Sequence, residues 1–294
     1  MHPLRIPLQP APPQEFGGLR YWFREAPGDV GAAPLMVAVH GVRRRPQQLL
    51  EAFAPFAARQ GCHLLVPWFD TPAHADYQRL GRPGRGPRAD LLLIALVEML
   101  ALRHVLRDEG LFLFGHSAGA QFVHRFVLAH PDRVHRYALG AAGWYTMPDA
   151  QFEFPLGTRH ALPGFPAMCA ERFLRVPGRV FVGERERSAG ATLRRTAWLD
   201  EVQGTDRLQR AERWVDAMAG AAALRGLPPP VQLVRLADAA HSFGGLVRRA
   251  RLVHHVWRFL FDVCPCGCSP VPGFHEGSHR AVRPANDAAW LQPR

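Results

Sequence analysis

The stretch Leu111-Phe112-Leu113-Phe114-Gly115-His116-Ser117-Ala118-Gly119 runs from four apolar residues into a serine that has glycine two positions away on each side. An unbroken apolar run is typical of a strand buried on both faces of a parallel sheet, and the apolar spacing over residues 118–129 indicates a helix behind the serine. The two glycines let strand and helix approach closely while the serine hydroxyl is exposed at a sharp bend. This Gly-x-Ser-x-Gly pattern makes Ser117 the candidate nucleophile.

Strands and helices alternate on both sides of this turn. Continuous apolar runs predict further strands at residues 35–39, 63–67, 137–140, 179–183 and 231–236. Apolar residues at helical spacing predict helices at residues 46–60, 89–107, 118–129, 208–224 and 245–263. The alternation predicts an α/β fold, in which a mostly parallel sheet is covered by helices on both faces.

Three parts of the chain depart from this alternation. Residues 1–34 are rich in Pro and Gly around an aromatic cluster at residues 19–23, and we expect an N-terminal segment with candidate edge strands there. Residues 35–263 are predicted to be one domain, and the Pro- and Gly-rich residues 144–176 a small lid inserted into it. Residues 264–294 lack any periodicity and are predicted to be a flexible tail.

The tail offers thiolate and imidazole groups in Cys264, Cys266, Cys268, His275 and His279. Structural zinc sites usually separate their cysteines by two or more residues, whereas here single residues separate them. A flexible tail is the favoured interpretation, and a metal site is its alternative.

The chain carries a net charge of +11 from 36 arginines and no lysine. This balance favours a solvated, arginine-rich surface, because none of the known nucleic-acid-binding motifs is present. The start of the chain lacks the continuous apolar run of a secretory signal, and the longest apolar stretch, residues 91–102, is broken by Glu98 and is too short to cross a bilayer. The odd count of five cysteines argues against a disulfide framework. We expect a cytoplasmic protein without stable membrane insertion, whose oligomeric state the sequence leaves open.

A serine hydroxyl needs a nearby base, and the base needs a third group to orient it. After a strand–serine–helix turn, the acid and then the histidine follow later in the chain. His241 comes a short loop after the last predicted strand, so among the 15 histidines its position makes it the candidate base.

The acid is expected after the strand at residues 179–183, where the chain has two glutamates and no aspartate. Glu186 is the candidate, since a glutamate orients an imidazole as an aspartate does. Glu184, Asp238 and Asp149 remain alternatives.

An oxyanion that forms during acyl transfer needs two fixed N–H donors. The backbone amide of Ala118, directly after the nucleophile, is one candidate. The turn His40-Gly41-Val42 at the end of the first core strand supplies the other, the amide of Val42. His40 and Gly41 are therefore also expected to border the substrate.

Together these residues resemble the α/β-hydrolase superfamily over about residues 35–262, and more narrowly its small esterases related to poly(3-hydroxybutyrate) depolymerases. The narrower resemblance rests on four stretches: residues 39–44, residues 115–119, residues 142–149 with Phe154-Pro155, and a fourth from Val182-Gly183-Glu184 through Gln203-Gly204, Arg207 and Arg210-Ala211. Family members usually have aspartate where Glu186 stands. The resemblance implies the α/β-hydrolase fold and serine-dependent cleavage of a carboxylic ester through an acyl-enzyme, without a metal or organic cofactor.

The substrate is then a small-molecule or oligomeric ester, with no nucleic-acid partner. Trp144 and Tyr145, just beyond a strand end, are candidate walls of an acyl pocket, the alternative being that they belong to the core. Arg43, Arg44 and Arg45 are interpreted as a solvated basic loop, with contact to an anionic substrate as the alternative. Two other functions stay open: a peptidase or acyltransferase on the same fold, and a ligand-binding protein whose triad has decayed.

Overall fold

The computed structural model of the chain describes residues 12–28, 32–70, 72–82, 86–107, 109–159, 170–187 and 193–261. The predicted tail at residues 264–294, with its cysteines and histidines, lies outside these ranges. Within them, every helix is too short or too polar to cross a membrane.

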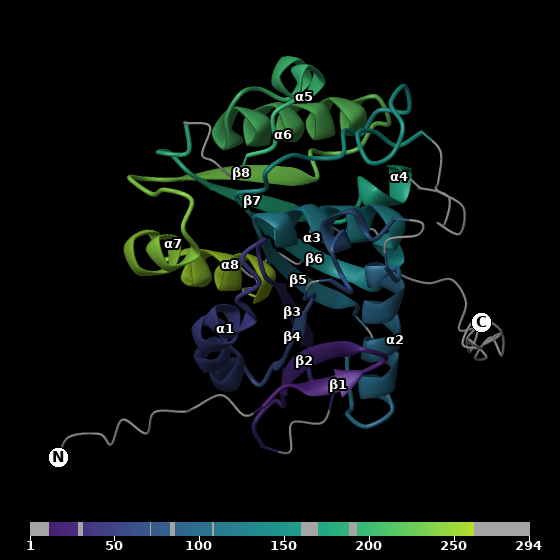
Figure 1. Cartoon of the computed structure of the whole chain (residues 1–294), viewed down its shortest axis with the longest axis vertical. Coiled ribbons are helices and arrows are strands. Elements are labelled where there is room, and N and C mark those ends of the chain that lie inside the picture. The colour runs from purple at the N-terminus through teal and green to yellow at the C-terminus, as the bar shows by residue number, and fades with distance from the viewer. Residues whose placement is uncertain are drawn as a thin grey trace. The chain divides into compact units, whose positions relative to one another are not determined.

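A single sheet carries the site and has eight strands in the described residues, in the order β1-β2-β4-β3-β5-β6-β7-β8 (Figure 1). Neighbours from β4 to β8 are parallel, whereas β1 and β2 add antiparallel strands at one edge. The strands are β1 (Gln14–Phe16), β2 (Leu19–Arg24), β3 (Leu35–Val39), β4 (His63–Trp68), β5 (Leu111–His116), β6 (Val134–Gly140), β7 (Gly178–Gly183) and β8 (Val231–Leu236). The predicted α/β fold with a mostly parallel sheet is confirmed.

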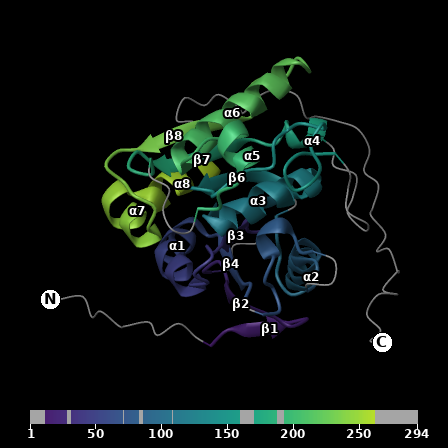
Figure 2. The same ribbon diagram turned by 45° about the horizontal axis from the view of Figure 1, so that its top comes forward.

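Alternate residues of the central strands enter two hydrophobic cores, one on each face of the sheet, and different helices cover the two faces (Figure 2). In β5, Leu111 and Leu113 face one core and Phe112 and Phe114 face the other. The first core is covered by α2 (Ala89–Ala101), α3 (Ala118–Ala129) and α6 (Arg207–Ala223), and the second by α1 (Pro46–Gln60), α7 (Phe243–Ala250) and α8 (Leu252–Phe261). Short helices complete the described elements: η1 (Tyr77–Arg79), η2 (Pro131–Arg133), α4 (Ala170–Phe173) and α5 (Ala197–Val202).

The prediction of one final helix over residues 245–263 was wrong. Ser242 caps α7 by accepting a hydrogen bond from the Gly245 amide (3.1 Å), so this helix begins earlier, at Phe243. Arg251 then adopts a left-handed conformation with a φ of 50°, and its amide donates to the Leu246 carbonyl. This turn ends α7 and starts α8 in a new direction, which lets both helices bury their apolar faces.

The predicted lid falls partly outside the described residues. Residues 144–147 are buried against the rest of the domain, and residues 148–159 continue in turns. The lid function of residues 144–176 stays a prediction, as do the domain boundaries.

Candidate active site

Ser117 lies in the sharp turn between β5 and α3, where backbone geometry sets its side chain at the mouth of a pocket. Its φ of 56° and ψ of −112° are strained for a residue with a side chain. The turn persists because its amide donates to the Gly140 carbonyl at 2.7 Å. A Cβ at Gly115 would lie 2.2 Å from the Gly119 carbonyl oxygen, and one at Gly119 would lie 2.1 Å from the Val39 carbonyl oxygen. Both flanking positions therefore require glycine, as the sequence pattern predicts.

The three residues of the predicted triad meet at this turn. His241 Nε2 lies 3.1 Å from Ser117 Oγ, and His241 Nδ1 lies 2.7 Å from Glu186 Oε2. Since an ionised carboxylate only accepts hydrogen bonds, Nδ1 carries the ring proton. Nε2 is then the acceptor that faces the Ser117 hydroxyl, which is the arrangement a general base needs.

Close packing of two loops brings the carboxylate to the imidazole. A Cβ at Gly183 would lie 2.2 Å from the Ala239 carbonyl oxygen, so the end of β7 touches the loop that carries His241. Glu186 Oε1 also accepts from the Gly183 amide at 3.1 Å, which fixes the second carboxylate oxygen. Glu186 is only 3% exposed, and its position depends on this backbone contact.

The other three carboxylates that the sequence leaves open lie elsewhere. Glu184 and Asp238 are exposed to solvent, and Asp149 accepts a hydrogen bond from the Gln151 amide at 2.7 Å. All four are in the described residues, and Glu186 is the one hydrogen-bonded to His241.

Arg207, which sequence reasoning did not single out for the site, lies behind the carboxylate. Its Nε is 3.9 Å from Glu186 Oε2, and both side chains are buried. Burial lowers the pKa of Arg207, and the charge of Glu186 opposes this shift. Each charge thus compensates the burial of the other. No local sequence pattern links the start of α6 to the end of β7, so only the fold reveals this pair.

His116 packs flat against the candidate base, with ring centroids 5.2 Å apart and an interplanar angle of 29°. Burial lowers the pKa of His116 to about 3, and the neighbouring His241 adds to the shift. His116 is therefore neutral at ordinary pH and does not repel a proton arriving on His241.

The loop after β3 is held so that the Val42 amide has a fixed direction. The Phe69 amide donates to His40 Nε2 at 3.0 Å, so the ring proton is on Nδ1, which lies 2.9 Å from the Gly41 carbonyl oxygen. The Arg44 amide donates to the same oxygen at 2.9 Å. Because a trans peptide points its C=O and N–H in opposite directions, these bonds turn the Val42 N–H away from them.

The same loop lies directly against the turn at Ser117 between β5 and α3, which we call the elbow. A Cβ at Gly41 would be 3.3 Å from Ser117 Cβ, so the Val42 and Ala118 amides belong to neighbouring segments. Ala118 opens α3, and amides in the first turn of a helix have no acceptor within it. His40 and Gly41 line the pocket as predicted, but both ring nitrogens of His40 are engaged within the protein. Direct contact of His40 with substrate stays a prediction.

Replacement of His40 by alanine is expected to lower kcat about tenfold to a hundredfold with a smaller change in KM, since a loosened Val42 amide stabilises the transition state less. Steady-state kinetics with a neutral nitrophenyl ester measure this split. Tyr77→Phe, which removes only the hydroxyl that donates to the His40 carbonyl at 2.8 Å, is the milder control. A rise in KM with unchanged kcat would assign His40 to substrate binding instead.

Trp144 and Tyr145 lie outside the set of residues that line the pocket at Ser117. Tyr145 stacks on Trp214 with ring centroids 4.7 Å apart, and its backbone exchanges two hydrogen bonds with the Gln203 side chain. The Arg125 guanidinium lies 4.0 Å from the Trp144 ring centroid. Both aromatic residues are buried, and their role as walls of an acyl pocket stays a prediction.

Three buried histidines should make the fold sensitive to acid. Burial lowers the pKa of His40 to about 4 and that of His116 to about 3, and it places the pKa of His124 well below the usual value. An unfolded chain takes up a proton on each of them below about pH 6.5, whereas the folded chain does not. Their contribution to stability is therefore complete above pH 6.5 and is lost as the pH falls toward the folded pKa values.

We expect the free energy of unfolding to fall by up to about 1.4 kcal/mol per pH unit for each such histidine between about pH 6 and about pH 4.5. Urea denaturation over this range measures the slope. His124→Gln, away from the elbow, should reduce the contribution of these three histidines by about a third. A slope that His124→Gln does not alter would contradict the assignment.

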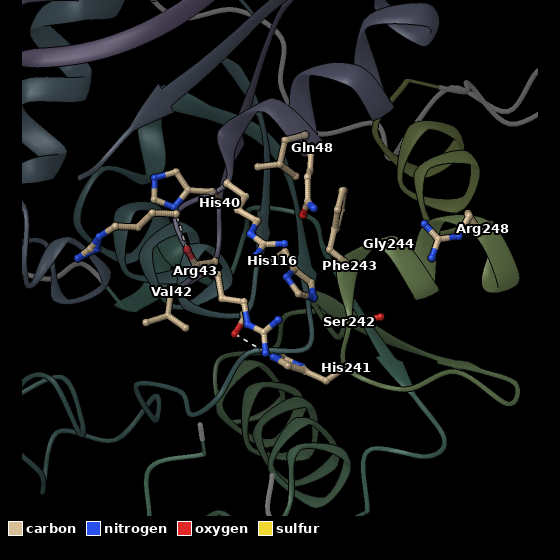
Figure 3. A pocket seen from close by; sticks show the side chains of 15 residues that line it. His40, Val42, Arg43, Gln48, His116, His241, Ser242, Phe243, Gly244 and Arg248 are labelled. Carbon is tan, nitrogen blue, oxygen red and sulfur yellow. Dashed lines mark hydrogen bonds between the residues drawn. The ribbon is translucent and has the colours of Figure 1, made fainter. Parts of the chain in front are cut away.

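A pocket of about 390 Å³ opens beside Ser117, within the size range of small-ligand sites (Figure 3). Residues from the β3–α1 loop, the elbow and the start of α7 line it, among them Ser117, His116 and His241. The candidate nucleophile and base thus face a cavity that a substrate can enter.

No protein-family model matches the sequence, and no curated protein sequence is significantly similar to it. Solved structures do match. Poly(aspartic acid) hydrolase-1 from Sphingomonas sp. KT-1 aligns with 25% identity over 81% of this chain and 93% of its own, with a TM-score of 0.71. A poly(3-hydroxybutyrate) depolymerase from Bordetella parapertussis aligns with 24% identity over 83% of this chain and 93% of its own, with a TM-score of 0.68.

A fluorophosphonate-binding serine hydrolase from Staphylococcus aureus shares the fold at 13% identity over 81% of this chain and 91% of its own, with a TM-score of 0.51. The sheet topology and these similarities identify the chain as a member of the α/β-hydrolase superfamily.

Proposed function

We propose that the chain is a serine hydrolase that cleaves carboxylic esters through an acyl-enzyme on Ser117. The observation that carries the proposal is the unbroken hydrogen-bond chain from Ser117 Oγ through His241 to Glu186, in a pocket open to ligand. The poly(aspartic acid) hydrolase, the poly(3-hydroxybutyrate) depolymerase and the serine hydrolase among the matched structures support it.

In the first step, His241 Nε2 takes the proton of Ser117 as its oxygen bonds to the ester carbonyl carbon. The tetrahedral intermediate collapses, its bond to the alkoxy oxygen breaks, and the imidazolium returns the proton to the leaving alcohol. Water then repeats the sequence on the acyl-enzyme, with His241 again as base, and releases the carboxylic acid. Glu186 holds the ring orientation and stabilises the transient imidazolium in both halves.

Negative charge develops on the carbonyl oxygen in both tetrahedral intermediates, and we assign its stabilisation to the Val42 and Ala118 amides. His40 supports the first amide through the Gly41 carbonyl, and the positive end of the α3 dipole supports the second.

The proposal is tested by treating the full chain with a fluorophosphonate probe while following hydrolysis of 4-nitrophenyl butyrate. Labelling should remove activity in proportion to the modified fraction, and peptide mapping should place the label on Ser117. Absence of both labelling and turnover would favour a ligand-binding protein with a decayed triad.

Amide hydrolysis is the second candidate reaction, because one matched structure is described as a poly(aspartic acid) hydrolase and that polymer has an amide backbone. The same residues serve both reactions, which differ in how much the leaving group depends on the proton from His241. Comparing the rates of hydrolysis of 4-nitrophenyl butyrate and of the 4-nitroanilide of butyric acid separates the two reactions. Transfer of the butyryl group to added alcohols would reveal an acyltransferase.

A small-molecule or oligomeric ester as substrate and a cytoplasmic location belong to the same proposal. Trp144 and Tyr145 do not line the pocket at Ser117, and they remain candidate walls of an acyl pocket only if it extends beyond that cavity. The depolymerase among the matched structures favours an oligomeric ester. Nucleic acid has no part in it.

A further inference from the structure

One side of the pocket beside Ser117 is strongly basic. Four of its lining residues are arginines, namely Arg43, Arg44, Arg45 and Arg248, and its lining includes no aspartate or glutamate. The surface that a substrate at Ser117 touches thus includes four positive charges and no carboxylate.

These charges are not neutralised within the described part of the chain, where none of the four arginines forms an ion pair. Arg44 has the closest internal partners, with Nη2 3.5 Å from the His74 carbonyl oxygen and its guanidinium 5.5 Å from the Tyr77 ring centroid, and both are uncharged contacts. Arginines elsewhere bind carboxylates directly, as in the pairs Arg20–Asp70, Arg88–Asp90 and Arg235–Glu212. The four arginines at the pocket have no such carboxylate partner among the described residues, so their charges stay available to a ligand.

Two separate elements supply these arginines. Arg43, Arg44 and Arg45 stand between β3 and α1, directly after the Val42 amide, whereas Arg248 belongs to α7, which follows His241. Figure 3 shows Arg43 and Arg248 on opposite sides of His116 and His241. A negative group in the pocket is thus within the field of charges on both sides.

We infer that the substrate carries carboxylate groups near the scissile bond, and that this arginine wall selects anionic over neutral esters. The inference rests on the proposed function and specifies its substrate class. Like charges lining a cleft focus the field and raise the local concentration of opposite charge, and guanidinium groups bind carboxylates in a bidentate manner. The wall contributes recognition, while Ser117, His241 and the two amides carry out the chemistry.

The test compares two matched pairs of esters, one with the charge in the acyl group and one with it in the leaving group. The first pair is the mono-4-nitrophenyl ester of adipic acid against 4-nitrophenyl hexanoate. The second is the butyrate ester of 4-hydroxybenzoate against that of 4-hydroxybenzamide. In at least one pair, kcat/KM for the anionic ester should exceed that of the neutral one by about tenfold at low ionic strength.

Two perturbations should remove this preference. Raising the salt concentration from about 0.02 M to about 0.5 M should bring the ratio of anionic to neutral kcat/KM near unity, because exposed charges are screened. The combined variant Arg43→Gln, Arg45→Gln, Arg248→Gln should do the same at low salt. Arg249→Gln is the control. Arg249 is exposed on α7, as Arg248 is, but it does not line this pocket.

A single carboxylate and a polyanionic chain are distinguished by inhibition of neutral-ester hydrolysis. Polyacrylate that inhibits at a far lower carboxylate concentration than adipate indicates an oligomeric anion, whereas equal inhibition per carboxylate indicates a small one. Equal kcat/KM within both ester pairs, or a preference that Arg249→Gln reduces as much as the triple variant, overturns the inference while ester hydrolysis stands. Failure of the proposed function looks different, because neither ester of any pair is then cleaved and no probe labels Ser117.

Discussion

Ser117→Ala is expected to lower kcat for 4-nitrophenyl butyrate by about 10⁶-fold and to abolish fluorophosphonate labelling, because the acyl-enzyme has no other oxygen on which to form. His241 and both amides stay in place in this variant. Any residual turnover then measures what binding and the oxyanion donors do without a nucleophile. KM should change little, since the hydroxyl contributes little to ground-state binding.

Ser242→Ala is the matched control for this experiment. Ser242 lines the same pocket, but it is exposed and its hydroxyl caps α7 by accepting from the Gly245 amide at 3.1 Å. We expect it to keep its labelling and its kcat, with a small loss of stability from the missing cap. Equal labelling of wild type and Ser117→Ala would remove Ser117 from the mechanism, provided that thermal unfolding shows both to be folded.

The elbow and the sheet were predictable from the sequence because their causes are local. The apolar run of β5, its two flanking glycines and the helical spacing of α3 lie within twenty consecutive positions. The strand over residues 231–236 and the helices over residues 46–60 and 118–129 have the predicted bounds, because local residues mark their ends, as Gly61 in a left-handed conformation ends α1. His241 followed from order along the chain, and its distance to Ser117 agrees with that prediction.

The rest of the site depends on contacts between distant segments. The sequence leaves four carboxylates open for the acid, and only the approach of Gly183 to the Ala239 carbonyl brings Glu186 to the imidazole. Arg207 is 21 positions further along the chain, so its pairing with Glu186 follows from the fold rather than from spacing. The break at Arg251 went unpredicted because neither glycine nor proline marks it, and packing of two helices on one sheet face decides it.

Glu186→Gln is the second large effect, with kcat/KM expected to fall about 10⁴-fold while Ser117 and His241 remain in place. A glutamine is isosteric with glutamate, but it cannot stabilise the imidazolium that forms when His241 takes the serine proton. If its amide donates to Nδ1, the ring proton moves to Nε2 and no acceptor faces the Ser117 hydroxyl. Fluorophosphonate labelling should slow in parallel, since it needs the same proton transfer.

Glu186→Asp tests the effect of side-chain length separately from that of the negative charge. The aspartate retains the charge that compensates Arg207, yet it is one methylene shorter than a side chain that spans from the Gly183 amide to His241 Nδ1. An intermediate loss, about a hundredfold, is expected for it, because the charge persists while the hydrogen bond lengthens. Glu184→Gln and Asp238→Asn change exposed carboxylates near the same loops and should retain full activity. If Glu186→Gln retained full activity while Asp238→Asn lost it, the acid would be Asp238, and the bond seen between Glu186 and His241 would serve only the packing of the two loops.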